Sequence, residues 1–190
     1  LTNITADRAE LLRPMKIMNK YRQIAAVGQI NDMACWAASL KWWYKAAMSI
    51  NASQTKLWER YKSRATQLGG MPDNDMKFII NENGMQLFEF PVATGFTFAK
   101  VRDLLMCGPI YTAFTEYGTN KRHVNVIYGI TGDSVWADVS CMEPQDHEAG
   151  GGKWKGKHIS RGLPDFNSVG SVWAGVHRGN YREFWSCFGE

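Results

Sequence analysis

The stretch Gln29–Ser39, which reads QINDMACWAAS, decides the fold that the sequence predicts. Asn31 or Asp32 can cap a helix, because side chains of this type accept hydrogen bonds from the first-turn amides. Apolar residues then recur at helical spacing, at Trp36, Leu40, Trp43 or Tyr44, and Ala47. This pattern predicts a helix whose first turn contains Cys35.

Cys35 is a candidate nucleophile because of this position. An ordinary thiol, with a pKa near about 8.5, is only slightly ionised at neutral pH. The amides of a first helical turn favour a thiolate, and an imidazolium partner favours it further. A small buried cysteine is the alternative interpretation of the same residue.

A histidine and an acid for this cysteine are found in the second half of the chain. His123 begins a β-branched run that extends to Ile130, and Thr131–Ser134 can form a hairpin turn before the next run, Val135–Ser140. His123 and Asp138 lie eight residues before and seven residues after Thr131. We therefore expect Asp138 to lie opposite His123 and to orient its ring.

Gln29 is a candidate donor to the oxyanion that forms during acyl transfer. A side-chain amide together with the backbone N–H of the nucleophile can hold the negatively charged oxygen. Gln29 precedes Cys35 by six residues, in the segment that leads into the predicted helix. An exposed polar residue in a turn is the alternative interpretation.

These residues resemble the motifs of papain-like cysteine peptidases. The stretch Gln29–Ser39 is similar to the oxyanion-glutamine and nucleophile-helix motif, and His123–Gly129 followed by Val135–Asp138 is similar to the histidine and acid strands. The short spacing between histidine and acid looks closer to the bacterial branch, which includes bacteriocin-processing peptidases and secreted effector peptidases. The resemblance implies a Cys35, His123 and Asp138 triad with Gln29 in the oxyanion hole, and Trp36 is a candidate substrate-binding residue.

The order of the predicted elements indicates an α+β fold, with a helical half that carries the nucleophile packed on an antiparallel β-sheet half. Helices are predicted at residues 5–13, 31–47, 53–68, 73–83 and 97–107. Strands are predicted at residues 85–90, 109–115, 123–130, 135–140, 171–177 and 181–188, and residues 21–27 are expected as a strand or an extended entry segment.

Length and composition indicate a single domain over residues 1–190, with residues 1–28 as an N-terminal extension and 142–170 as a long mobile loop. Hydrophobic residues make up 45% and charged residues 21%, which is typical of a globular protein. The chain begins with Leu1 rather than Met, which suggests a domain cut from a longer protein.

Several partners and cofactors are not expected. No apolar run is long enough to span a membrane, and the net charge of +4 is too small and scattered to indicate nucleic-acid binding. Cys35, Cys107, Cys141 and Cys187 form no metal-ligand spacing, and neither do His147 and His158, so we expect no metal or cofactor.

The function that the resemblance implies is cleavage of a protein substrate by a cysteine endopeptidase. A secreted bacterial effector or toxin acting in the cytoplasm of a target cell, with a cognate inhibitor or immunity protein, is the expected role. The alternatives are a leader-processing peptidase of an exporter, an amidase or transglutaminase-type acyl transferase, and a catalytically silent binding module.

Overall fold

A computed structural model describes residues 17–116, 118, 121–132, 136–145, 154–167 and 170–186. Its centre is a six-stranded sheet in which all the paired strands are antiparallel, in the order β1-β6-β2-β3-β4-β5. The strands are β1 (Met85–Phe90), β2 (Ile110–Thr115), β3 (Arg122–Thr131), β4 (Asp138–Glu143), β5 (Lys157–Gly162) and β6 (Val172–His177). The α+β prediction is confirmed.

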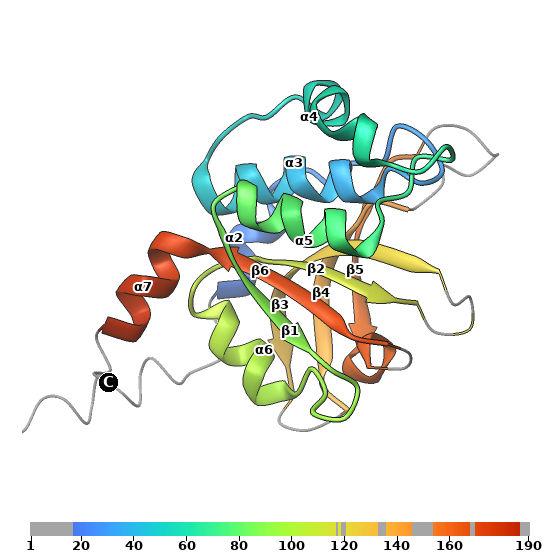
Figure 1. The fold of residues 1–190 in the computed structure, drawn as a ribbon. Coiled ribbons are helices and arrows are strands. Elements are labelled where there is room, and N and C mark those ends of the chain that lie inside the picture. The colour runs from blue at the N-terminus through green and yellow to red at the C-terminus, as the bar shows by residue number, and fades with distance from the viewer. Residues whose placement is uncertain are drawn as a thin grey trace, which may run out of the picture.

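Helices cover both faces of this sheet (Figure 1). Their bounds are α2 (Ile17–Arg22), α3 (Cys35–Met48), α4 (Gln54–Tyr61), α5 (Asp73–Glu82), α6 (Phe98–Leu105) and α7 (Arg178–Ser186), with short 3₁₀ turns η1 (Lys62–Arg64) and η2 (Leu163–Phe166). Helices α3 and α5 lie on one face and α6 lies on the other. Each face has its own buried apolar cluster.

Helix α3 is the central helix of the apolar cluster on the α3 and α5 side of the sheet, because its large apolar residues are buried there. Trp36, Trp42 and Trp43 are fully buried, and each indole N–H donates to a backbone carbonyl, those of Gly69, Ile24 and Pro109 respectively. A buried indole N–H usually has such a partner, because leaving it without a hydrogen bond would destabilise the fold. The three tryptophans therefore fix α3 against three separate loops.

Several predicted elements differ from the structure. The run 181–188 was expected as a strand, but Arg178–Ser186 forms helix α7, in which Tyr181 packs on Phe88 of β1. Residues 21–27, expected as a strand or an extended entry segment, form the end of α2 followed by irregular chain. The helix expected at 53–68 ends at Tyr61. Leu68, which was expected on its buried stripe, lies beyond the helix and is exposed.

The region 142–170 is also more regular than a long loop. It contains the end of β4, the whole of β5 and the turn η2, whereas residues 146–153 and 168–169 lie outside the described residues. The helix expected at 5–13 and Cys187 lie outside them as well. Strand β5 becomes the edge of the sheet beside β4.

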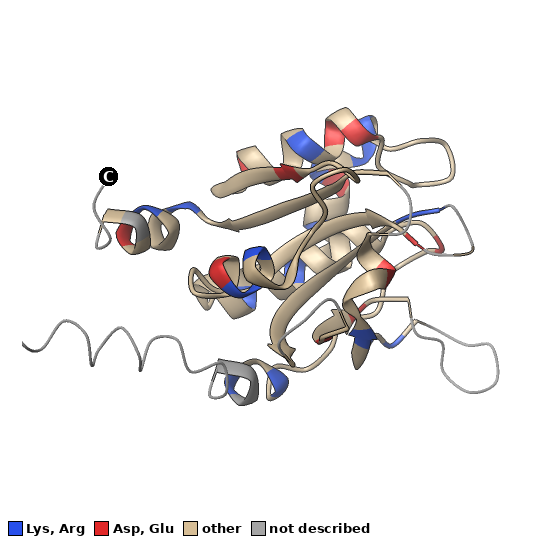
Figure 2. Ribbon diagram, turned by 90° about the horizontal axis from the view of Figure 1, so that it is seen from below, with Lys and Arg blue, Asp and Glu red and all other residues tan. Residues whose placement is uncertain are grey.

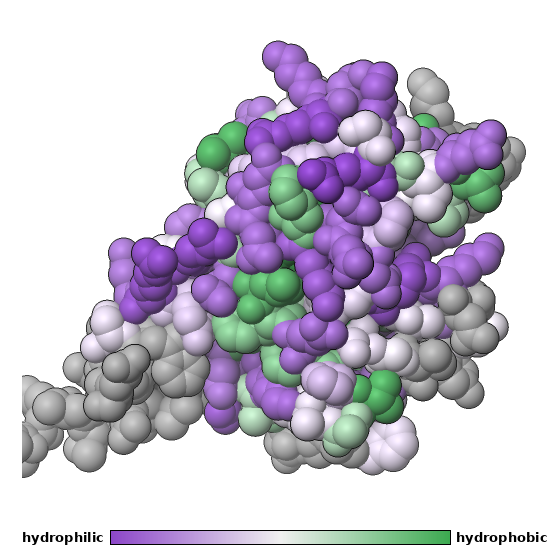
Figure 3. Space-filling view, in the orientation of Figure 1, coloured by the Kyte–Doolittle hydropathy of each residue, from purple (hydrophilic) through white to green (hydrophobic). Residues whose placement is uncertain are grey.

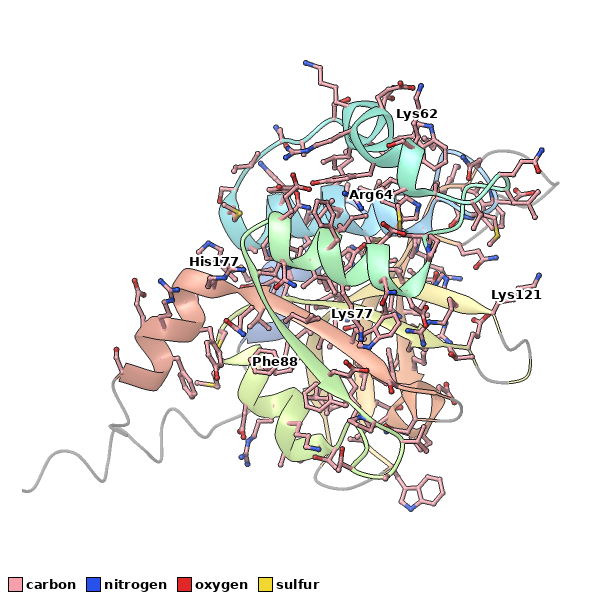
Figure 4. The ribbon with its side chains drawn as sticks, viewed as in Figure 1. Lys62, Arg64, Lys77, Phe88, Lys121 and His177 are labelled. Atoms are coloured by element: carbon pink, nitrogen blue, oxygen red, sulfur yellow. The ribbon has the colours of Figure 1, made fainter. Side chains whose placement is uncertain are left out.

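Charged residues of both signs are intermixed along the ribbon (Figure 2). The space-filling view is mostly hydrophilic and has an apolar patch where β1 passes the start of α7, near Phe88 (Figures 3 and 4). Among the described residues, no helix combines the length and the hydropathy needed to cross a bilayer.

Candidate active site

Cys35 is the first residue of α3, as the sequence predicts, and its thiol is free and partly exposed. The N-cap is Ala34, which has no side-chain cap, rather than Asn31 or Asp32. Asn31 Oδ1 instead accepts from the N–H of Met33 in the preceding turn. Because no side chain caps the first-turn amides, these N–H groups are available to stabilise a negative charge on the sulfur.

Two hydrogen bonds hold the start of α3 against the sheet. Ser39 Oγ donates to the carbonyl oxygen of Val124 at 3.0 Å, which ties the helix to the residue next to His123. The Tyr111 hydroxyl of β2 donates to the carbonyl oxygen of Trp36 at 3.1 Å. Both contacts are buried, so they fix the height and rotation of the helix at Cys35.

His123 receives its two partners from different elements. Its Nε2 lies 2.6 Å from Glu143 Oε1, which leaves Nδ1 for the Cys35 thiol, the other group that raises the pKa of the ring. Burial lowers the pKa of His123, but the hydrogen bonds and charges of Cys35 and Glu143 raise it more, to about 10. The charged imidazolium is therefore the favoured form at neutral pH.

Glu143 is the carboxylate that the structure places beside this histidine, and the sequence reasoning did not identify it. It is the last residue of β4 and is buried, and its Oε1 also accepts from the N–H of Gln145 at 2.9 Å. Burial raises its pKa, but His123, this N–H and the charge of Arg161 together lower it below its ordinary value. Glu143 is thus an ionised acceptor for the imidazolium.

Asp138 does not lie opposite His123, so this expectation is wrong. The hairpin closes at the pair Thr131–Asp138, and a register shift follows between Ile127 and Gly129. Asp138 is therefore at the loop end of β4 and is exposed, while His123 lies eight residues from that end of β3. The connecting loop is longer than the four-residue turn that the sequence suggested.

A signal for Glu143 was present in the sequence. Val139, Cys141 and Glu143 alternate along β4 and share one face, on which the first two are fully buried. A carboxylate at the end of an otherwise apolar face needs a charged partner, since a buried unpaired charge is very costly. That reasoning selects Glu143 over the exposed Asp138.

Gln29 is buried beside the acid strand. Its backbone N–H donates to the carbonyl oxygen of Pro144 at 3.2 Å, next to Glu143. Neither its Nε2 nor its Oε1 has a hydrogen-bond partner among the described residues, although the side chain is only 4% exposed. A buried amide of this kind can donate to a further group without breaking an existing contact.

A cleft of about 610 Å³ lies over the cysteine and the histidine, between the helices and the sheet. Its apolar lining includes Met71, Met76, Ala113 and Trp173. Trp36 also contributes, but its side chain is fully buried and stacks on Trp58, so it supports the wall. The charged lining residues are Asp32, Asp73, Glu116, Lys121 and Arg122, and Figure 4 shows Lys121 beside the outer end of β3.

The remaining histidines of the described chain have structural surroundings. His158 contacts the carbonyl oxygen of Ile24 through Nε2 at 2.8 Å and packs against Trp42 and Tyr128. His177 contacts Asn180 through Nδ1. Within the described ranges, no three metal-ligating side chains are grouped together, and His147 lies outside those ranges.

Comparison with known proteins identifies the type of fold and chemistry. A family model described as "Papain-like cysteine protease AvrRpt2" matches residues 18–150. The peptidase domain of Streptococcus ComA, a bi-functional ABC transporter of a quorum-sensing pathway, has a similar structure, with a TM-score of 0.53 and 17% identity. The match covers 81% of this chain and 98% of that one. No curated protein matches the chain.

Proposed function

The chain belongs to the papain-like cysteine protease AvrRpt2 family and is a cysteine peptidase, and we propose that Cys35, His123 and Glu143 cleave its protein substrate, with Gln29 in the oxyanion hole. The observation that carries the assignment is the position of the buried His123 ring between the partly exposed Cys35 thiol and the buried Glu143 carboxylate. It contains the nucleophile, the acid–base and the orienting carboxylate that acyl transfer requires.

The reaction begins with the thiolate of Cys35 and the imidazolium of His123. The sulfur attacks the peptide carbonyl carbon, and the carbonyl π electrons move to oxygen, where the Cys35 amide and Gln29 Nε2 donate hydrogen bonds. The C–N bond then breaks as the Nδ1 proton of His123 passes to the leaving amine. A thioester of Cys35 and a neutral imidazole remain.

Hydrolysis reverses these roles. His123 takes a proton from water, the resulting hydroxide attacks the thioester, and the C–S bond breaks to release the carboxylic acid and the thiolate. Glu143 accepts a hydrogen bond from Nε2 throughout, which keeps Nδ1 turned toward the sulfur. Transfer to an amine instead of water would use the same thioester and give a transferase.

The first test is the Cys35→Ala variant. We expect wild-type protein to cleave an unfolded protein such as casein, and the variant to lose all turnover while its circular dichroism is unchanged. Cys107→Ala is the matched control, because Cys107 is a buried thiol of the other apolar cluster. Turnover that survives in Cys35→Ala would contradict the proposal.

The reactivity of Cys35 gives a second test that needs no substrate. Alkylation by iodoacetamide, followed by mass spectrometry, should label Cys35 rapidly down to about pH 5, because the imidazolium keeps the sulfur ionised. His123→Ala should slow this labelling strongly. An ordinary thiol profile in the wild-type protein would exclude the ion pair.

For the biological role, we propose a secreted bacterial effector or toxin that acts in the cytoplasm of a target cell and has a cognate inhibitor. The resemblance of residues 29–39 and 123–129 to the bacterial branch of papain-like peptidases supports this role, whereas the transporter peptidase domain shares only the fold at 17% identity. Expression inside a target cell should be toxic only when Cys35 is intact. Cleavage of an exporter's leader peptide without such toxicity would favour the processing alternative.

A further inference from the structure

A second cation lies behind the acid of the candidate site. Arg161 Nη2 is 3.1 Å from Glu143 Oε2, and both side chains are largely buried, at 15% and 8% exposure. The other oxygen, Oε1, is occupied by His123 and by the N–H of Gln145. Both oxygens of the carboxylate are therefore held, one facing the imidazole and one facing the guanidinium.

Arg161 comes from the edge strand β5 and reaches Glu143 along the face of β4. It pairs in register with Val139, two alternate positions before Glu143 on the same face. Its guanidinium interacts with the Cys141 side chain on the way, lies 5.4 Å from the centre of the Phe114 ring, and approaches Glu116 Oε1 at 3.5 Å. Phe114 in turn contacts the His123 ring edge-on.

Arg161 stabilises the ionised form of the buried Glu143 carboxylate. Burial opposes ionisation of the carboxyl group, and His123 interacts with the Cys35 side chain as well as with Glu143. Cys141 stays neutral, since burial first, and then the charge of Glu143, raise its pKa to about 12. Arg161 is thus the cation beside Glu143 that takes no part in proton transfer, and Glu116 is the further acid that faces it.

We propose that Arg161 is a positioning residue of the peptidase reaction. It fixes the glutamate side chain in the one rotamer that meets His123 Nε2, and its charge keeps that carboxylate ionised. Glutamate has one more rotatable bond than aspartate, so an acid of this length is oriented only when its second oxygen is also bound. This inference rests on the proposed function of Cys35, His123 and Glu143.

The test compares Arg161→Met and Arg161→Lys with the wild-type protein. Arg161→Met should lower kcat by about 10- to 100-fold with little change in KM, because the acid is misaligned without loss of cleft contacts. The fall in kcat/KM and in the rate of Cys35 alkylation at low pH is called the acid limb. In Arg161→Met this limb should lie about one pH unit higher, since Glu143 then protonates more readily. Arg161→Lys should restore the limb but not the full kcat.

Arg102→Met is the matched control, because Arg102 forms an exposed pair with Asp103 on α6, away from the site. Its pH profile should equal that of the wild-type protein. Rates are expressed per folded protein, with the folded fraction taken from circular dichroism, so that unfolded protein does not alter them. An unchanged acid limb in Arg161→Met would overturn the proposal and leave the triad intact.

Two further outcomes distinguish failure of the Arg161 proposal from failure of the proposed function. If Arg161→Met does not fold, Arg161→Lys carries the test, and a lysine variant with wild-type kcat would contradict the positioning role. If wild-type Cys35 itself reacts as an ordinary thiol, the proposed function fails and Arg161 has no imidazolium to support.

Discussion

At the residue scale, Glu143 and Asp138 stand at the two ends of the same strand and provide a direct comparison. Glu143→Gln keeps the shape of the side chain but removes its charge, so kcat/KM should fall by about 10²- to 10⁴-fold. Asp138→Asn should leave kcat/KM within about twofold, because Asp138 is exposed beside Thr131. Steady-state kinetics of both variants checks this prediction.

A lower kcat/KM in Asp138→Asn than in Glu143→Gln would contradict the assignment of Glu143 as the acid. If Asp138→Asn were the slower variant, the carboxylate beside His123 would not be the one that orients it. Circular dichroism of both proteins is the control for folding. Both substitutions replace a carboxylate by its amide, so the comparison isolates position.

The His123–Glu143 pair should also appear in the pH dependence of stability. The pKa of His123 rises from 6.5 in the unfolded chain to about 10, so its contribution is complete below pH 6.5 and is lost as pH rises toward 10. The pKa of Glu143 falls below 4.5, so its contribution is present above that pH and is lost on acidification. The pair is most stabilising between about pH 4.5 and 6.5.

Urea unfolding of wild-type protein and His123→Gln at several pH values measures this effect. The difference in free energy of unfolding should shrink steadily between pH 6.5 and 10. A difference that grows over this range would mean that His123 is neutral in the folded protein.

The sequence predicts the nucleophile, the histidine and the glutamine of the candidate site because each lies next to a local signal. Cys35 follows a turn and opens an apolar helix, and His123 opens a β-branched run. Counting along the hairpin favoured Asp138 and failed, because the loop length and the register shift after Ile127 differ from the expectation; the alternation of Val139, Cys141 and Glu143 along the strand was the signal for the acid. A change of a few residues in the loop selects a different carboxylate.

At the element scale, the segment before Gln29 passes very close to the backbone of the residues that lead into β5. A Cβ on Gly28 would lie 1.8 Å from the carbonyl oxygen of Trp154, and one on Gly156 would lie 2.5 Å from the backbone of Val27. Neither contact can be relieved by a side-chain rotation. We call this crossing of residues 27–28 and 154–156 the clasp.

Gly156→Ala should therefore destabilise the protein more than a positive φ alone explains. Gly84 is the matched control, since its φ of 75° is close to the 70° of Gly156 but a Cβ there would meet nothing. Gly84→Ala should cost about 1 kcal/mol, and Gly156→Ala about 2 kcal/mol more. Urea unfolding of both variants checks the difference, and equal losses would show that the clasp yields.

Elements with a cap or a clear period were predicted well. Thr97 and Gly108 bracket α6, and the run 85–90 is β1 as expected. Helix α7 was mistaken for a strand because its aromatic residues suit both elements, and tertiary contacts favour the helix, among them that of Tyr181 with Phe88 and the hydrogen bond from Asn180 to the carbonyl oxygen of Cys107. Contacts between distant parts of the chain cannot be read from a local pattern.

At the scale of the whole molecule, the stable and the labile parts of the site belong to different regions. Strands β2 and β3 are central and buried, whereas β5 is an edge strand paired only with β4. Edge elements open at lower free energy than the core. Opening of β5 removes Arg161 from Glu143 without unfolding α3.

Low urea concentrations should therefore reduce activity before the core unfolds. We expect the midpoint of activity loss to lie below the midpoint of the near-ultraviolet circular dichroism, which reports the buried tryptophans of α3. Hydrogen exchange should be faster at β5 amides than at β2 and β3 amides. Coincident midpoints, with equal exchange, would show that β5 unfolds only with the whole protein.

The clasp also has a consequence for the order of events during synthesis. Residues 27–28 leave the ribosome before their partner, residues 154–156, which follows 126 or more residues later. A nascent chain that ends before Gly156 holds Cys35, His123 and Glu143 but lacks the backbone that closes against the segment before Gln29. The segment before Gln29 therefore reaches its folded position only after residues 154–156 have been synthesised, well after Cys35 and His123 have left the ribosome.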